Sequence, residues 1–215
     1  MDPKTSRFHE QLTPDNAAML LIDHQTGTML MGVGDLDPVT LKNNVLLLAG
    51  VAQIFNLPTI LTTSNQEGPN GPLLPELLEM LPQAEIVHRK IINSWDDPNF
   101  VRAVERTGRQ KLIMAGVTTD VCLAFPAISA LAAGYDVYAV VDASGTWNTL
   151  TQQAAMLRMA QAGVIVVNTI AVAAELQRDW TLPTATALGR LFRERLPNFG
   201  MLIANLEFTA GAVRK

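Results

Sequence analysis

The sequence predicts an α/β fold in three layers, in which a doubly wound, mostly parallel six-stranded sheet of Rossmann type lies between two layers of helices. Short apolar runs alternate with longer segments of helical period along the chain, without an internal repeat or a low-complexity linker. The apolar runs are continuous, which is typical of strands that are buried on both faces. The length of 215 residues suits one domain, so we expect a single domain over residues 1–215.

Six runs are interpreted as strands because each is short, rich in Val, Ile, Leu or Met, and bounded by turn residues. In chain order they are Ala17–Asp23, Pro58–Thr63, Glu85–His88, Lys111–Gly116, Asp136–Asp142 and Val164–Asn168. The segments between and after them carry helical spacing, and the last three end near a glycine or a proline. These expected helices are Val39–Asn56, Leu73–Leu81, Pro98–Arg106, Asp120–Ala133, Leu150–Ala162 and Ala171–Trp180. Such alternation indicates a parallel sheet with helices on both faces.

The C-terminal segment 184–215 is expected to form a helix and a tail that pack against something. Ala185–Arg195 has helical spacing, and the tail Asn198–Lys215 is rich in apolar residues. A terminus this apolar should not remain in water. It therefore packs either on its own domain or across a subunit interface, and we expect a homo-oligomer.

Composition excludes several classes of partner. Hydrophobic residues make up 48% of the chain and charged residues 17%, so disorder is not expected. A formal charge of -4 gives no reason to expect nucleic acid. No apolar run approaches the roughly 20 residues that span a bilayer. One cysteine cannot form an internal disulfide, and the polar segment 1–10 lacks the apolar core of a secretory signal, so the cytoplasm is the expected location.

The single cysteine, Cys122, lies at the junction between an expected strand and an expected helix. A thiol near a helix N-terminus meets unpaired N–H groups and the positive end of the helix dipole, both of which favour the thiolate. The same N–H groups could hold an oxyanion. The alternative is that Cys122 is a small buried hydrophobe of the core.

Chemically active residues follow three of the expected strands. Asp23 closes the first strand, Arg89 and Lys90 follow the third, and Cys122 comes after the fourth. In doubly wound sheets ligands bind beyond the carboxyl ends of the strands, so an acid, a cation and a thiol would meet there. The carboxylate would exchange protons, the cation would stabilise negative charge, and the thiol would be the nucleophile. Each residue alone also has an ordinary explanation as a cap, a turn residue or a surface charge.

Three features occur in a fixed order along the chain: the strand-ending Asp23, a basic residue before Asn93-Ser94-Trp95, and Gly116-Val117-Thr118-Thr119-Asp120-Val121-Cys122. With these features the sequence resembles, from about Asp15 to Trp180, the isochorismatase-like cysteine hydrolase superfamily, which includes nicotinamidases and carbamoylsarcosine amidases. Further details resemble the YcaC-like subgroup: Asp23-His24-Gln25, the segment 56–64, Gly68-Pro69-Asn70-Gly71-Pro72 and Ala124-Phe125-Pro126-Ala127.

The resemblance implies a triad of Asp, Lys and Cys. Carried over, Asp23 is the base that takes the thiol proton, and Cys122 attacks an amide-like carbonyl to form a thioester. The family also has a cis peptide bond before the cysteine, which would be Val117–Thr118 here. The turn would direct the Thr118 N–H, together with that of Cys122, into an oxyanion hole.

The third member of the triad is either Arg89 or Lys90. Counting back from Trp95 without a gap places the family's lysine position on Arg89, and the YcaC-like subgroup can carry arginine there. Lys90 would require a slip of one residue. Neighbours on a strand point to opposite faces, so only one of the two should enter the site. An arginine would act as a permanent cation that cannot shuttle a proton at neutral pH.

The resembled pattern places five side chains at the substrate pocket, and for the two aromatic ones the alternative is a core or subunit contact. They are Gln25, Asn65, Asn93, Trp95 and Phe125.

No metal and no other cofactor is expected. Nicotinamidases of this superfamily hold a divalent ion with an Asp and two His residues after the second strand, where this chain has the segment 62–67. Its three histidines, His9, His24 and His88, are far apart in sequence and lack ligand spacing. This departure also argues against nicotinamidase activity.

Two functions follow from these observations. The first is a metal-independent cysteine hydrolase that cleaves a C–N bond of a small-molecule substrate through a thioester on Cys122. The second is a non-catalytic scaffold or binding protein that keeps the fold. An isochorismatase-type ether hydrolase is a third possibility, although nothing in the sequence specifies an anionic ring acid. The YcaC-like subgroup forms closed homo-octamers of two stacked rings, so a homo-octamer is expected.

Overall fold

The computed structural model describes residues 10–213 and has a six-stranded sheet at its centre. The strand order is β3-β2-β1-β4-β5-β6, and each neighbouring pair is parallel. The strands are β1 (Ala17–Ile22), β2 (Thr59–Ser64), β3 (Glu85–Arg89), β4 (Lys111–Gly116), β5 (Asp136–Val140) and β6 (Ile165–Val167). This architecture confirms the predicted doubly wound α/β fold.

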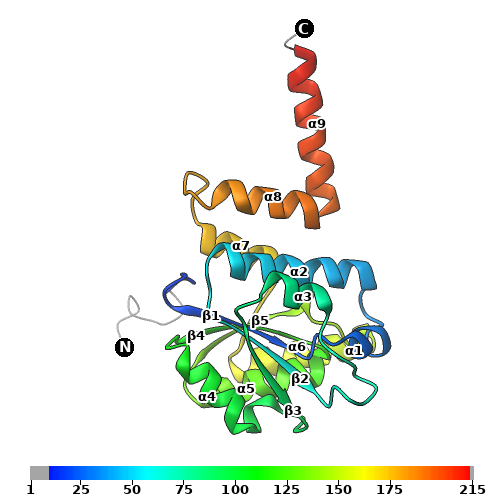
Figure 1. Cartoon of the computed structure of the whole chain (residues 1–215), viewed down its shortest axis with the longest axis vertical. Coiled ribbons are helices and arrows are strands. Elements are labelled where there is room, and N and C mark those ends of the chain that lie inside the picture. Colours follow the sequence, from blue (N-terminus) through cyan, green and yellow to red (C-terminus); the bar gives the residue numbers. More distant parts are fainter. Residues whose placement is uncertain (1–9, 214–215) are drawn as a thin grey trace.

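Helices cover both faces of the sheet (Figure 1). One face packs against α2 (Pro38–Ile54), α3 (Pro75–Met80), α7 (Thr169–Gln177) and α8 (Ala185–Arg195). The other packs against α4 (Pro98–Arg106), α5 (Ala124–Ala132) and α6 (Thr149–Ala162). The remaining helical segments are α1 (Thr26–Met31), η2 (Ser94–Asp96), the π-helical turn η3 (Thr119–Leu123), η4 (Val141–Ala143) and α9 (Pro197–Val213).

Strand β1 shows why the apolar runs are continuous. Its six side chains are fully buried, and they alternate between the two hydrophobic cores. Met19 and Leu21 face the core under α2, whereas Leu20 and Ile22 face the core under α5. A central parallel strand has no solvent face, so alternation with polar residues is absent.

Several boundaries differ from the prediction. Strand β1 ends at Ile22, because Asp23 has a φ of 58°, which lies in the left-handed region and breaks the extended backbone. The helix expected from Asp120 is a π-helical turn followed by α5 from Ala124. Helix α1 was not predicted, and the expected tail after Asn198 belongs to α9.

Helix α8 joins the main body, whereas α9 projects away from it (Figure 1). Leu188, Leu191 and Phe192 of α8 are buried in the core under α2. The ring of Phe199 in α9 packs edge-on against Phe192, with 5.7 Å between ring centroids. Among the described residues, no helix is long and apolar enough to cross a membrane. The N-terminal segment used to predict location lies, apart from Glu10, outside the described residues.

Candidate active site

The three predicted strand ends meet at one edge of the sheet. Strands β1 and β4 are neighbours at the point where the strand order reverses, and Asp23 follows β1 directly. Cys122 lies in η3, just after β4, and Arg89 is the last residue of β3. The crevice at such a switch point is where doubly wound sheets bind ligands.

Asp23 and Arg89 form a buried ion pair. The Arg89 Nη2 donates to Asp23 Oδ2 at 2.5 Å, and both side chains are fully buried. The Arg89 Nη1 donates to the carbonyl of Ile91 and, at 2.9 Å, to that of Ile92. These carbonyls hold the second terminal nitrogen of the guanidinium in place.

Lys90 points away from this pair. Its side chain is 79% exposed, and its Nζ lies 4.0 Å from Glu67 Oε2. The structure therefore places Arg89, not Lys90, beside Asp23, and the prediction that kept Lys90 as a catalytic candidate is wrong. Lys90 directly follows β3, and consecutive residues of an extended segment point their side chains to opposite sides.

Burial raises the pKa of Asp23 to about 6, although the Arg89 guanidinium and the Cys122 thiol both act to lower it. At neutral pH the carboxyl group is therefore mostly ionised but close to its titration range. Its Oδ1 is buried and accepts no N–H or O–H hydrogen bond from the described residues. Because Oδ2 is occupied by Arg89, Oδ1 is the oxygen left to exchange a proton.

The thiol of Cys122 has its pKa raised, first by burial and then by the negative charge of Asp23. The Thr118 N–H and the Arg89 guanidinium oppose this shift but do not overcome it. This shift runs against the expectation of a thiol that ionises easily, because the sequence does not show that the partly buried Cys122 lies beside a carboxylate. The raised pKa favours the neutral thiol, so a nucleophilic role for Cys122 would require a nearby base to remove its proton.

The turn that carries Cys122 is held by the loop after β5. The Val117–Thr118 peptide bond is cis. The Gly116 N–H donates to Ser144 Oγ at 3.0 Å, and the Thr119 N–H donates to the Gly145 carbonyl at 3.0 Å. Contacts from the end of another strand thus position the turn that carries Cys122.

His24 is a further residue of this region that the sequence analysis did not identify as part of the site. Its ring is fully buried, and its Nε2 lies 2.9 Å from the Ala143 carbonyl. A carbonyl only accepts, so Nε2 carries the proton. Burial lowers the pKa of His24 to about 4, so the ring is neutral near pH 7. His24 thereby links the segment that carries Asp23 to the loop after β5, which also contacts Thr119.

Two of the predicted lining residues come from the β1–β2 side of the edge. Gln25 is fully buried, and its amide bonds the backbone of Ser64 and the Gly71 carbonyl. It positions loops, so its assignment as a pocket-lining residue is wrong. Asn65 is exposed, and it borders a recess of about 330 Å³ beside Arg89. Asn65 remains a candidate for substrate contact.

The other three predicted lining residues make structural contacts. Trp95 packs edge-on against the rings of Phe100 and Tyr135, so the core-contact alternative holds for it. Asn93 accepts from the Trp95 N–H and donates to Ser129 Oγ on α5 at 3.2 Å. Phe125 is partly buried. The Arg158 guanidinium of α6 lies 5.1 Å from the centre of the Phe125 ring.

Within residues 10–213, no group of three His, Cys, Asp or Glu side chains gathers as metal ligands would. His24 donates from Nε2 to the Ala143 carbonyl, and His88 Nδ1 lies 2.8 Å from Thr63 Oγ1. His9 lies outside the described residues.

The sequence matches the family described as the Isochorismatase domain over residues 17–171. It is 46% identical over 198 residues to a protein of Escherichia coli K12 described as "Probable hydrolase YcaC", which covers 92% of this chain and 94% of that protein.

Two solved structures resemble this one closely, each with a TM-score of 0.89. YcaC from Pseudomonas aeruginosa, solved with hexane-2,5-diol and covalent acrylamide, is 49% identical and covers 93% of this chain and 98% of its own. The Escherichia coli YcaC structure is described as an octameric hydrolase of unknown specificity. It is 48% identical, and the match covers 93% of this chain and 97% of that one.

Proposed function

This chain belongs to the isochorismatase family and to its YcaC-like group, and from that premise we propose that it is a metal-independent cysteine hydrolase of small amide-like molecules. The observation that carries the proposal is the position of Asp23. Its Oδ2 is fixed by Arg89, while its Oδ1 has no N–H or O–H donor among the described residues. Asp23 and the Cys122 thiol are close enough to shift each other's pKa.

The proposed reaction begins with transfer of the thiol proton to Asp23 as the sulfur attacks the amide carbon. The C–S bond forms, and the carbonyl π electrons move to oxygen. The Thr118 N–H, whose influence on Cys122 already lowers the thiol pKa, donates to this oxyanion together with the Cys122 N–H. As the C–N bond breaks, Asp23 returns the proton to the leaving nitrogen, and a thioester remains.

Water then completes the cycle. A water oxygen attacks the thioester carbon, and Asp23 takes a proton from that water. The C–S bond breaks, the sulfur regains a proton from Asp23, and the carboxylic acid leaves. Arg89 holds Asp23 in orientation throughout, and as a permanent cation it takes no part in moving protons.

Two observations support a covalent mechanism. A relative of 49% identity was solved with covalent acrylamide, a small electrophilic amide. In this chain the thiol lies beside a carboxylate whose pKa of about 6 suits a general base near neutral pH. We further propose that the protein works in the cytoplasm as a homo-octamer, because the Escherichia coli relative is described as octameric and a single cysteine suits a reducing compartment.

A scaffold or binding role is the second candidate. It is favoured by the raised pKa of Cys122 and by an arginine where the resembled triad has lysine. In this case the ion pair of Asp23 and Arg89 would serve only to stabilise the sheet edge.

The experiment that tests the proposal incubates the protein with a panel of small primary and secondary amides. Released amine or ammonia is measured, and intact mass detects an acyl adduct. The proposal expects turnover or an acyl adduct in the wild type, with both lost in Cys122→Ala and Asp23→Asn. Turnover that persists in Cys122→Ala contradicts the proposed nucleophile. Absence of both turnover and adduct across the panel favours the scaffold role.

A further inference from the structure

Trp147 exposes a large aromatic ring in the loop after β5. The residue is 56% exposed, although tryptophan is on average one of the more deeply buried residue types. Its loop connects η4 to α6 at the carboxyl end of β5. Because β5 pairs with β4, whose carboxyl end leads to Cys122, Trp147 lies at the edge of the sheet where the candidate site is found.

The backbone on both sides of Trp147 is held by hydrogen bonds. The Thr146 N–H donates to Asp35 Oδ1 at 2.8 Å, and the Thr146 hydroxyl donates to Asp120 Oδ1 at 2.7 Å. On the other side, Asn148 is the N-cap of α6. The indole is therefore presented by a fixed backbone, and a fixed side chain loses less entropy when a ligand binds to it.

The indole borders the turn that carries Cys122. A Cβ placed on Gly32, the C-cap of α1, would lie 3.1 Å from Thr118 Cγ2 and 3.8 Å from Trp147 Cη2. The Thr118 methyl group and the tip of the indole thus flank the same point, and Gly32 has no side chain to separate them. The Thr118 N–H in turn acts on the Cys122 thiol and lowers its pKa. Trp147 is therefore a neighbour of the site.

Cations near the site are already engaged by the protein. Arg89 donates to Asp23 and to the Ile92 carbonyl. The Lys90 Nζ lies 4.0 Å from Glu67 Oε2. A substrate carboxylate or phosphate would have to compete with Asp23 and Glu67 for these cations. The described part of the site therefore favours an uncharged substrate.

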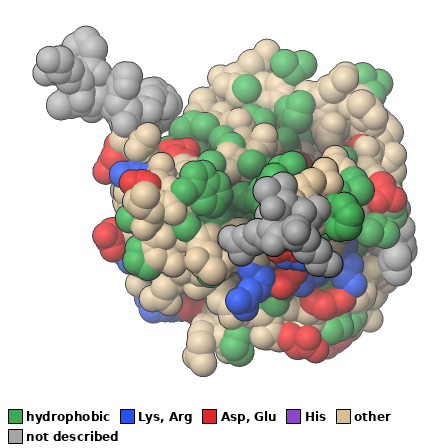
Figure 2. Space-filling view, turned by 90° about the horizontal axis from the view of Figure 1, so that it is seen from above, with side chains coloured by type: hydrophobic (Ala, Val, Ile, Leu, Met, Phe, Trp, Pro, Cys, Tyr) green, Lys and Arg blue, Asp and Glu red, His purple; other side chains and the backbone are tan. Residues whose placement is uncertain are grey.

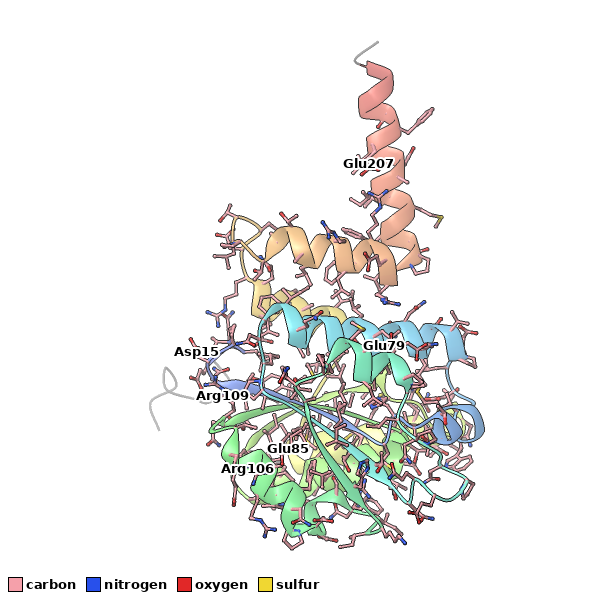
Figure 3. All side chains as sticks on the ribbon, viewed as in Figure 1. Asp15, Glu79, Glu85, Arg106, Arg109 and Glu207 are labelled. Atoms are coloured by element: carbon pink, nitrogen blue, oxygen red, sulfur yellow. The ribbon has the colours of Figure 1, made fainter. Side chains whose placement is uncertain are left out.

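Charges elsewhere on the described surface are paired or mixed in sign. Arg106 pairs with Glu85, and Arg109 donates to the Asp15 carbonyl (Figure 3). Figure 2 shows Lys and Arg side chains interspersed with Asp and Glu on the face seen from above. The two signs offset each other there, so this face gives no field that would steer a charged ligand.

We propose that Trp147 is a specificity-determining residue of the Cys122 site, and that its indole binds an uncharged apolar group of the amide substrate. Ligand pockets combine apolar walls with a few polar groups that orient the ligand. Here the indole supplies the wall, whereas Asp23 and the Thr118 N–H supply the polar groups. This inference rests on the proposed function and narrows its substrates to amides that carry such an apolar group.

The test compares two probes that alkylate thiols, iodoacetamide and N-benzyl-2-iodoacetamide. With each probe the thiol gives up its proton, the sulfur displaces iodide, and a thioether forms on the carbon next to the amide carbonyl. The rate of Cys122 modification is measured by intact mass, and glutathione supplies the intrinsic ratio of the two rates. We expect the wild type to favour the benzyl probe by about three-fold or more over that ratio, as one aromatic contact provides.

Three variants assign this preference. Trp147→Ala should lower the ratio of the two rates to the glutathione value. Trp147→Phe should keep part of the preference, because a smaller apolar ring remains. Trp180→Ala is the matched control, since Trp180 is 60% exposed and packs edge-on against Phe192 of α8, outside the site. This control should show the wild-type ratio.

The outcomes separate this inference from the proposed function. A wild-type Cys122 that reacts with neither probe overturns both. A reactive Cys122 with the glutathione ratio overturns the role of Trp147 alone. The same holds for a preference that survives in Trp147→Ala, or that Trp180→Ala removes equally.

Discussion

At the scale of single residues, the site depends on the pKa of Asp23, which burial raises and two neighbouring groups lower. Burial raises its pKa to about 6, while Arg89 and the Cys122 thiol favour the ionised form. The same carboxylate makes it harder for Cys122 to ionise alone. In the proposed mechanism the pair therefore works by proton transfer from the Cys122 thiol to Asp23, and neither group needs to ionise into solvent.

Replacing Arg89 tests this balance. In Arg89→Ala, Asp23 loses the guanidinium that lowers its pKa, so its pKa should rise above about 6. The variant should lose about 3–5 kcal/mol of unfolding free energy at about pH 8, where a buried charge is left unpaired. The loss should be smaller at about pH 5, because a protonated carboxyl group needs no cation. Lys90→Ala is the matched control and should resemble the wild type in urea unfolding. A pH-independent loss would contradict the ion pair.

His24 provides a second test at this scale. Its pKa is lowered from 6.5 to about 4, so the unfolded chain takes up this proton before the folded chain does. His24 should therefore cost the wild type about 3 kcal/mol of stability as the pH falls from 7 to 4, a loss absent from His24→Gln. Asp23, whose pKa is raised in the folded state, adds stability as the pH falls. It does so equally in both proteins, so the difference between them reports His24 alone. Equal pH dependence of urea unfolding in the two proteins would refute the buried neutral ring.

Much of the candidate site could be predicted, because chemical residue types at the ends of strands are visible in a sequence. Asp23, Arg89 and Cys122 were identified in this way. The role of Gln25 and the pKa of Cys122 could not be predicted, since both depend on what surrounds the side chain. His24 lies next to Asp23 in the sequence, but only its contact with Ala143 gives it a role.

At the scale of elements, close backbone approaches fix the loops that surround the site. A Cβ on Gly27 in α1 would lie 1.9 Å from the Pro69 carbonyl oxygen. The Gly27 N–H also donates to the Asn70 carbonyl at 2.8 Å. Glycine at this position allows α1 to pack directly against the loop after β2, which Gln25 also holds.

Two glycine substitutions should therefore have opposite effects. Gly27→Ala must displace the loop backbone, so we expect a lower melting temperature. Gly189→Ala in α8 meets no atom within 4 Å, and it should stabilise the helix by about 0.5–1 kcal/mol. Thermal unfolding of both variants measures the change in melting temperature. A Gly27→Ala protein as stable as the wild type would contradict the close packing of α1.

Most elements were predicted within a few residues, because buried strands and amphipathic helices have clear periodicities. Helix α1 was missed because its 6 residues are too few to show a period. Helix α9 was read only as an apolar tail, because its apolar residues do not gather on one face as the helical period requires of a helix packed on its own domain.

At the scale of the whole molecule, strand order brings the site together. Asp23 and Arg89 are 66 positions apart, and their side chains meet because β2 lies between β1 and β3 with parallel neighbours on both sides. The alternation of strands and helices predicted parallel pairing, but periodicity carries no information about which strands become neighbours.

The central claim is that Asp23 removes the proton of Cys122, and the pH dependence of acrylamide addition to Cys122 tests it most directly. The rate is measured by intact mass from about pH 5 to about pH 9 in the wild type, Asp23→Asn and Lys90→Ala. The wild type and Lys90→Ala should show a rise in rate centred near pH 6, where Asp23 ionises. Asp23→Asn should lack that rise and react more slowly at pH 7. Identical profiles for the wild type and Asp23→Asn would contradict the claim and leave Cys122 as a structural thiol.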